Sequence, residues 1–126
     1  NETIFKKNIT INKRSNKKIT ALIVIHIYGR TVNFEKLEKI CKKRNIMILE
    51  DAAEALGNFI LKGKNKNKHV GTVGTLGCLS FNGNKIITSG GGGMILTNDP
   101  KLASEHVHIP LQLDLAKTMI KGLVKS

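Results

Sequence analysis

Two apolar runs separated by an amphipathic stretch constrain the fold of this chain more than any other feature of its sequence. Residues 20–27 (TALIVIHI) form a continuous run rich in β-branched residues, and residues 46–49 (IMIL) form a second. Between them, after a plausible N-cap at Asn33, apolar residues recur at helical spacing with lysines on the opposite face. Strand, helix and strand within about thirty residues make a βαβ unit with parallel strands. The sequence therefore predicts an α/β fold whose mostly parallel sheet is covered on both faces, with flanking helices.

Further segments extend this prediction on both sides of the βαβ unit. They are a hairpin or extended segment at 1–19, a short helix start at 52–56, a loop or small hairpin at 57–75, strands at 76–81 and 94–97, and a helix at about 100–106. The pattern weakens after Glu105. Beyond that point, residues 106–110 are predicted to be extended and 111–124 to form an amphipathic helix.

Composition narrows the class of protein. With 126 residues, 40% of them hydrophobic, the chain has the size of one domain, and no apolar stretch approaches the length of a membrane span. It begins with Asn1 and shows no signal-peptide pattern, and Cys41 and Cys78 lack metal-ligand spacing. These features predict a reduced, cytoplasmic setting. His106 and His108 would share one strand face, but without a third ligand no metal site is predicted.

The charge of the chain raises an alternative function. Its net charge of +12 and pI near 10.0 are compatible with a basic α/β module that binds nucleic acid. Yet the excess is nearly all lysine, spread along the chain, and aromatic residues make up only 4%. Proteins that read nucleic acid usually add arginines and stacking aromatics. A solvated basic surface and no nucleic-acid partner is therefore the favoured interpretation.

Asp51 and Lys85 each follow a predicted buried strand, and four glycines, Gly90 to Gly93, come shortly after the lysine. Ligands of open α/β sheets bind outside the carboxyl ends of the strands. A lysine amine and a carboxylate placed there are what pyridoxal 5′-phosphate (PLP) requires, because the amine binds the cofactor aldehyde and the carboxylate keeps the pyridine nitrogen protonated. Taken singly, Asp51 could be a helix N-cap, Lys85 a solvated lysine and the glycine run a flexible turn.

Together, these motifs resemble the DegT/DnrJ/EryC1/StrS family of sugar aminotransferases, PLP enzymes of fold type I. The resemblance spans about residues 3–105 and looks closest to the branch that aminates UDP-linked 4-keto-6-deoxy sugars in the bacillosamine and legionaminic acid pathways. It is carried by His26-Ile-Tyr-Gly29, Glu50-Asp-Ala-Ala-Glu-Ala-Leu-Gly57, Lys62-Gly-Lys64, Gly71-Thr-Val-Gly74, Leu79-Ser-Phe81, Lys85, Gly90 to Gly93 and Thr97-Asn-Asp99.

The resemblance implies a role for each matching residue. Lys85 would be the catalytic lysine, which holds the cofactor as the internal aldimine and then moves the proton. Asp51 would pair with the pyridinium nitrogen, Ser80 would bind the cofactor phosphate, and Glu54 would lie beside the cofactor ring. Gly90 to Gly93 would let backbone approach the cofactor loop without Cβ clashes. Some family members carry histidine in place of the lysine and are dehydratases, so Lys85 favours amino transfer.

The resemblance also implies how the chain relates to a whole enzyme. Residues 1–105 would be a fragment of the PLP-binding large domain, of the aspartate aminotransferase-like fold. Residues 106–126 would be the divergent tail. The intact enzyme would be a homodimer that transfers an amino group from a donor such as glutamate to a nucleotide-linked keto sugar for cell-surface glycans. The chain alone is expected to be inactive, and an inactive remnant of such an enzyme is compatible with the same motifs.

Overall fold

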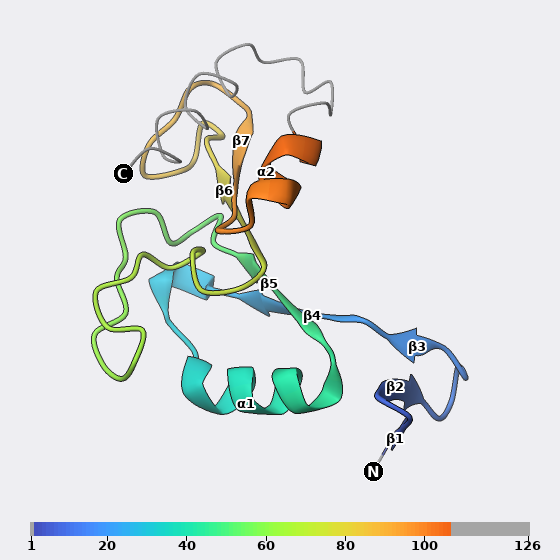
Figure 1. Ribbon diagram of the computed structural model, residues 1–126. Coiled ribbons are helices and arrows are strands. Elements are labelled where there is room, and N and C mark those ends of the chain that lie inside the picture. The colour runs from blue at the N-terminus through green and yellow to red at the C-terminus, as the bar shows by residue number, and fades with distance from the viewer. Residues whose placement is uncertain (1, 107–126) are drawn as a thin grey trace.

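The computed structural model describes residues 2–106, and Figure 1 shows how their strands and helices are arranged. The chain begins with a small antiparallel sheet of β1 (Thr3–Lys6), β2 (Ile9–Asn12) and β3 (Lys18–Ile19), in the order β1-β2-β3. The side chain of Thr10 on β2 is buried and donates a hydrogen bond to the carbonyl oxygen of Arg44 at 3.1 Å. The predicted N-terminal hairpin is confirmed, and it is tied to the rest of the fold.

A four-stranded sheet forms the centre of the described chain. It consists of β4 (Ala21–Ile25), β5 (Met47–Asp51), β6 (Leu76–Ser80) and β7 (Gly93–Leu96), in that order across the sheet. The pairs β4–β5 and β5–β6 are parallel, whereas β6 and β7 are antiparallel. The prediction of an α/β fold with a mostly parallel sheet is confirmed. The reversal at β7 adds that β6 and β7 are joined by a hairpin loop, residues 81–92.

Helix α1 (Phe34–Arg44) connects β4 to β5, as the apolar spacing predicts. The side chain of Asn33 accepts a hydrogen bond from the backbone N–H of Lys36 at 3.2 Å, so the predicted N-cap is present. At the other end Asn45 adopts a left-handed conformation with φ of 52°, a common way to end a helix. The buried face of α1 carries Phe34 and Cys41, which pack in one core cluster with Val24 and Ile48 of the sheet.

Only one face of the central sheet is covered by the described residues. Side chains alternate between the two faces of a strand, so Val24 is buried while its neighbours Ile23 and Ile25 are 64% and 57% exposed. Met47 on β5 lies on the same face of the sheet as Ile23 and Ile25 and is also exposed. The expectation that both faces are covered is therefore wrong for β4 and β5 within residues 2–106, because Ile23, Ile25 and Met47 remain exposed on this second face.

Three other local predictions are resolved by the structure. Residues 52–56 form turns instead of the start of a helix, and residues 57–75 form a loop in which Phe59 and His69 pair as an antiparallel bridge. The last helix, α2 (Pro100–His106), is confirmed. Because α2 includes His106, the prediction of an extended segment at 106–110 is wrong for its first residue. Residues 107–126, with His108 and the predicted helix at 111–124, lie outside the described part. No helix within residues 2–106 is long and apolar enough to cross a membrane.

Candidate active site

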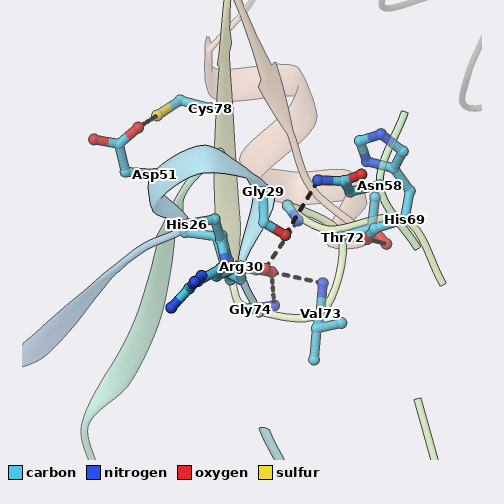
Figure 2. Close-up of polar contacts among 12 residues, drawn as sticks. His26, Gly29, Arg30, Asp51, Asn58, His69, Thr72, Val73, Gly74 and Cys78 are labelled. Atoms are coloured by element: carbon cyan, nitrogen blue, oxygen red, sulfur yellow. Dashed lines mark hydrogen bonds and ion pairs between the residues drawn. The ribbon is translucent and has the colours of Figure 1, made fainter. Parts of the chain in front are cut away.

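Asp51 is the last residue of β5 and lies where the parallel strands end. Its Oδ1 atom accepts a hydrogen bond from the backbone N–H of Ala53 at 3.1 Å and lies 3.9 Å from the sulfur of Cys78 (Figure 2). The contact with Ala53 closes a turn, and no helix begins there, so the alternative of a helix N-cap is not supported. Within residues 2–106, Oδ2 of Asp51 accepts no hydrogen bond. One carboxylate oxygen is thus fixed by the protein and the other is available to a ligand.

Lys85 lies in the hairpin loop between β6 and β7. Phe81 closes the neck of this loop, since its N–H donates to the Gly92 carbonyl oxygen at 3.1 Å and its own carbonyl oxygen accepts from the Ser89 N–H at 3.1 Å. The Lys85 side chain is only 18% exposed, and its Nζ atom lies 3.8 Å from Oε1 of Glu54. The loop therefore holds the amine inward, beside a carboxylate.

Three of the four predicted site residues line one cavity of about 650 Å³. Lys85, Glu54 and Ser80 line it, together with Tyr28 and Ile86. The Ser80 hydroxyl makes no hydrogen bond to any residue in the described range, so it too is available to a ligand. Asp51 does not line the cavity. Asp51 lies on β5, where it pairs with Cys78 of β6. Cys78 in turn comes two residues before Ser80.

The available groups match the needs of PLP. An inward amine, an uncommitted hydroxyl and a carboxylate with one free oxygen lie on β5, on β6 and in the loop that follows β6. PLP presents an aldehyde, a phosphate and a pyridine nitrogen to such groups. In the part of the chain that the structure describes, no cluster of three potential metal ligands occurs.

Glu50, the residue before Asp51, organises the backbone under the site. Its side chain is fully buried, and Oε1 accepts hydrogen bonds from the N–H groups of Val73 and Gly74 at 2.7 and 2.6 Å. Its Oε2 accepts from the Gly71 N–H at 2.8 Å and lies 3.0 Å from Nε2 of His26. We call Glu50, His26 and residues 71–74 the Glu50 hub.

The hub fixes the protonation state of Glu50. Burial alone would raise the pKa of this carboxyl, but hydrogen bonds from His26 and from the N–H groups of Gly74, Gly71 and Val73 outweigh it and leave the pKa lowered. Residues 71–74 lead directly into β6, so this ionised carboxylate determines where β6 begins beside β5. Glu50 belongs to the matching motif at residues 50–57, but the resemblance implies no role for it. The period-two alternation of a strand was the available signal, because it places Glu50 and Asp51 on opposite faces.

Cys78 and Tyr28 are two further residues that sequence reasoning did not assign to the site. Burial and the neighbouring Asp51 raise the pKa of the Cys78 thiol, so the thiol next to that carboxylate stays protonated. Tyr28 had been placed in a turn, and it lines the same cavity as Lys85. The signals in the sequence for Tyr28 were the turn that follows a strand and the matching motif His26-Ile-Tyr-Gly29.

Two positions of the run Gly90 to Gly93 have local reasons for glycine, and the expected approach to the cofactor loop stays a prediction. Gly90 has a φ of +81°, and a Cβ atom there would meet nothing within 4 Å. Its glycine is explained by the left-handed backbone and not by close approach. At Gly93 a Cβ atom would lie 2.8 Å from the carbonyl oxygen of Leu79, so crowding is the reason there, but against β6.

Comparison with known proteins agrees with this arrangement. Residues 3–112 match the DegT/DnrJ/EryC1/StrS aminotransferase family. The chain belongs to this family. A GDP-perosamine synthase of Escherichia coli O157:H7 is 39% identical over 108 residues, which cover 86% of this chain and 28% of that protein. A UDP-4-amino-4,6-dideoxy-N-acetyl-beta-L-altrosamine transaminase of Helicobacter pylori is 30% identical over 94% of this chain and 30% of that protein.

Solved structures of aminotransferases show the same fold. The Helicobacter pylori aminotransferase PseC, involved in the biosynthesis of pseudoaminic acid, matches with a TM-score of 0.55 and 33% identity over 66% of this chain and 21% of that one. An aminotransferase from Psychrobacter cryohalolentis matches with a TM-score of 0.59 and 31% identity over 66% of this chain and 20% of that one. The chain therefore spans less than a third of the relatives it matches, and it has the fold of the PLP-dependent aminotransferases over that span.

Proposed function

We propose that the protein to which this chain corresponds transfers an amino group from an amino acid donor such as glutamate to a nucleotide-linked keto sugar, using PLP. The observation that carries this proposal is the inward amine of Lys85 in a cavity shared with Ser80 and Glu54. The names of the relatives are its second support, since they include a GDP-perosamine synthase and a transaminase of a UDP-linked sugar.

Lys85 is the residue to which the chemistry is assigned. When bound, PLP supplies an electron sink that stabilises negative charge on the carbon next to the substrate nitrogen. Lys85 Nζ would hold the cofactor covalently and, once released, carry a proton to and from the reacting carbon. The contact with Glu54 at 3.8 Å and the shielding of the side chain keep this amine at the cavity instead of in bulk water.

Asp51 and Ser80 would orient the cofactor. Asp51 would hold a proton on the pyridine nitrogen through Oδ2, while the Ala53 N–H and the Cys78 thiol engage Oδ1. A fixed negative charge at this point stabilises the transition state without reorganisation during the reaction. Ser80 would donate its free hydroxyl to the phosphate, a charge-assisted hydrogen bond. Glu54 would keep its place beside the ring through the N–H of Tyr28.

The choice between amino transfer and dehydration is made on Lys85. Matched structures include a dehydratase, the Escherichia coli GDP-4-keto-6-deoxy-D-mannose-3-dehydratase with bound hydrated PLP, so similarity alone does not select the reaction. A lysine can both hold the cofactor and return as the proton carrier, which amino transfer needs. We assign the whole protein to the cytoplasm, where Cys41 and Cys78, both unpaired here, would stay reduced. We also propose a homodimer.

The proposal is tested by trapping PLP on the chain. The purified 126-residue protein is mixed with PLP, reduced with borohydride and digested, and the modified lysine is identified by mass spectrometry. The expected result is one dominant adduct at Lys85 that Lys85→Ala abolishes, while Lys101→Ala, a control at an exposed lysine, leaves it unchanged. Adducts scattered over surface lysines, or an undiminished major adduct in Lys85→Ala, would contradict the proposal.

A further inference from the structure

Loop 59–68 combines a cluster of lysines with exposed apolar side chains. Four of the last seven residues of its sequence, FILKGKNKNK, are lysines, and all four are exposed. Phe59 and Leu61 are 53% and 78% exposed, whereas Ile60 between them is buried in the core cluster. Burial of Ile60 anchors this part of the loop and leaves its two apolar neighbours in contact with solvent.

Internal hydrogen bonds give the loop a fixed shape. The N–H of Ile60 donates to the Lys68 carbonyl oxygen at 2.9 Å, and the N–H of Asn67 donates to the carbonyl oxygen of Ile60 at 2.8 Å. Gly63 turns the chain with φ of +79°, in the left-handed region that favours glycine. The lysines are therefore carried by an ordered segment.

Two glutamates of α1 dock the loop onto the helix. Oε1 of Glu35 accepts a hydrogen bond from the Lys64 N–H at 2.7 Å. Oε2 of Glu38 accepts from Nδ2 of the buried Asn65 at 2.9 Å and lies 3.0 Å from Nζ of Lys64. Figure 1 shows the loop reaching the N-terminal end of α1. Both carboxylates are used between loop and helix, so the other lysines of the loop have no carboxylate partner within residues 2–106.

Helix α1 adds lysines beside the loop. Lys36, Lys39 and Lys43 are exposed and recur at helical spacing, so they share the face opposite the buried face of the helix. Arg44 at the end of α1 contacts the N-terminal hairpin instead, with its guanidinium carbon 5.8 Å from the centre of the Phe5 ring. We call the outer face of α1 and loop 59–68 the lysine surface. It contains no arginine.

We propose that the lysine surface binds a bilayer that contains anionic phospholipids, with Phe59 and Leu61 inserted among the headgroups. This inference goes beyond the proposed function and does not depend on it. Clustered lysines are attracted to negatively charged headgroups, and their alkyl chains can lie along apolar surface while the amines stay in water. Exposed apolar side chains at the same place gain free energy by leaving water for the interface.

A nucleic acid also carries negative charge, but the residues of the lysine surface fit it less well. Nucleic-acid recognition uses arginine and aromatic rings that stack on bases. The one aromatic ring of this surface, Phe59, packs edge-on against His69 with 5.3 Å between the ring centres. Lysines act as point charges, which a layer of headgroups accommodates in any arrangement. Leu61 gains nothing from a phosphate backbone, whereas it is buried on contact with a bilayer.

The first test measures binding of the chain to phosphatidylcholine vesicles with and without phosphatidylserine. Binding should require phosphatidylserine and weaken as the ionic strength rises, because salt screens exposed charges. Lys62→Gln and Lys66→Gln should each weaken it about five-fold. Leu61→Ala should weaken it about five- to ten-fold through lost apolar contact. These side chains are exposed, so the variants should keep the wild-type circular dichroism spectrum.

Two control variants match these changes elsewhere on the chain. Lys101→Gln removes an exposed lysine of α2, and Ile23→Ala removes a 64% exposed side chain from the bare face of the sheet. Both should bind the vesicles as the wild type does. A loss in Lys101→Gln as large as that in Lys66→Gln would show that only the net charge of the chain matters. A loss in Ile23→Ala as large as that in Leu61→Ala would assign the binding to the bare face. Either result would overturn the proposal.

The second test uses the wild-type chain, so it does not depend on the folding of any variant. Amines are acetylated with and without vesicles, and the labelled lysines are identified by mass spectrometry. Vesicles with phosphatidylserine should protect Lys39, Lys62 and Lys66, while Lys101 reacts as in the free chain. Equal protection by soluble glycerophosphoserine would indicate a headgroup site instead of a bilayer surface. Stronger protection by RNA than by vesicles would indicate a nucleic-acid partner. Each of these two outcomes would overturn the proposal.

Discussion

Glu50 and Lys85 occupy opposite extremes of environment. Glu50 is fully buried, and each of its carboxylate oxygens has two hydrogen-bond partners. Lys85 lies in a hairpin loop whose residues 82–84 and 86–90 are all exposed, and its one polar side-chain contact in residues 2–106 is Glu54 at 3.8 Å. The hub is saturated with internal contacts, whereas the loop residue keeps its reactive atom uncommitted. The structural carboxylate of Glu50 and the reactive amine of Lys85 therefore differ in how many hydrogen bonds the protein itself provides to them.

The largest effect is expected from removing the hub carboxylate. Glu50→Ala leaves four hydrogen-bonding groups, two of them buried and two part-buried, without their acceptor and should lower the free energy of unfolding by about 3–5 kcal/mol, measured by urea denaturation. Glu54→Ala is the matched control, because Glu54 is 43% exposed, and it should cost less than about 1 kcal/mol. If Glu50→Ala does not fold, Glu50→Gln, which keeps the shape and part of the acceptor capacity, should show an intermediate loss. Equal losses of stability in the Glu50 and Glu54 variants would show that the internal hydrogen bonds of Glu50 stabilise the fold no more than the contacts of the exposed Glu54.

Acid should destabilise the fold through the Glu50 hub. The folded-state pKa of Glu50 lies below its ordinary value of 4.5, so its contribution to stability is fully present above that value and is lost as the pH falls through the lower folded-state pKa. Unfolding free energies measured from pH 7 downward should therefore drop once the pH passes below 4.5. In Glu50→Gln the position no longer titrates, so its stability should fall less over this window. A parallel decline in the two proteins would show that other carboxyls carry the acid sensitivity.

The smallest effect sharpens the comparison within the site itself. Asp51→Asn should change stability by less than about 1 kcal/mol, because Asp51 is half-buried and only one of its oxygens is bound. It should nevertheless lower the pKa of the Cys78 thiol, which burial and the Asp51 charge hold above its ordinary value. The rate of Cys78 alkylation as a function of pH reports this shift. Cys41 is buried and serves as the internal control. An unchanged Cys78 profile would mean that Asp51 does not influence the thiol.

The sequence predicted those parts of the molecule that follow from periodicity. The strands β4 and β5, the helix α1 with its Asn33 cap and the parallel pairing of β4 with β5 all follow from residues 20–51. The position of Asp51 at the strand end follows from the same unit. These features are local, so a strand and helix pattern is sufficient to define them.

The remaining features depend on contacts between distant segments. Glu50 became recognisable as a hub only when residues 71–74 were seen to fold back onto it, more than twenty residues along the chain. The short helix expected at 52–56 is replaced by turns, because Asp51 and Ala52 take part in local hydrogen bonds that favour a turn. The bare face at Ile23 and Ile25 was missed because a continuous apolar run gives no indication of which face finds a partner.

The antiparallel turn from β6 into β7 has a consequence for how this family can diversify. The hairpin loop is closed by the hydrogen bonds of Phe81, and its two ends are fixed by the pairing of β6 with β7. The sequence of the loop can therefore change without a change in the strands on either side. The identity of the residue at position 85 could then change while the Glu50 hub keeps the sheet intact. Proteins named as transaminases and as dehydratases are both similar to this chain. A change of reaction type is easiest where the reactive residue lies on a segment, such as this loop, that contributes little to the stability of the fold.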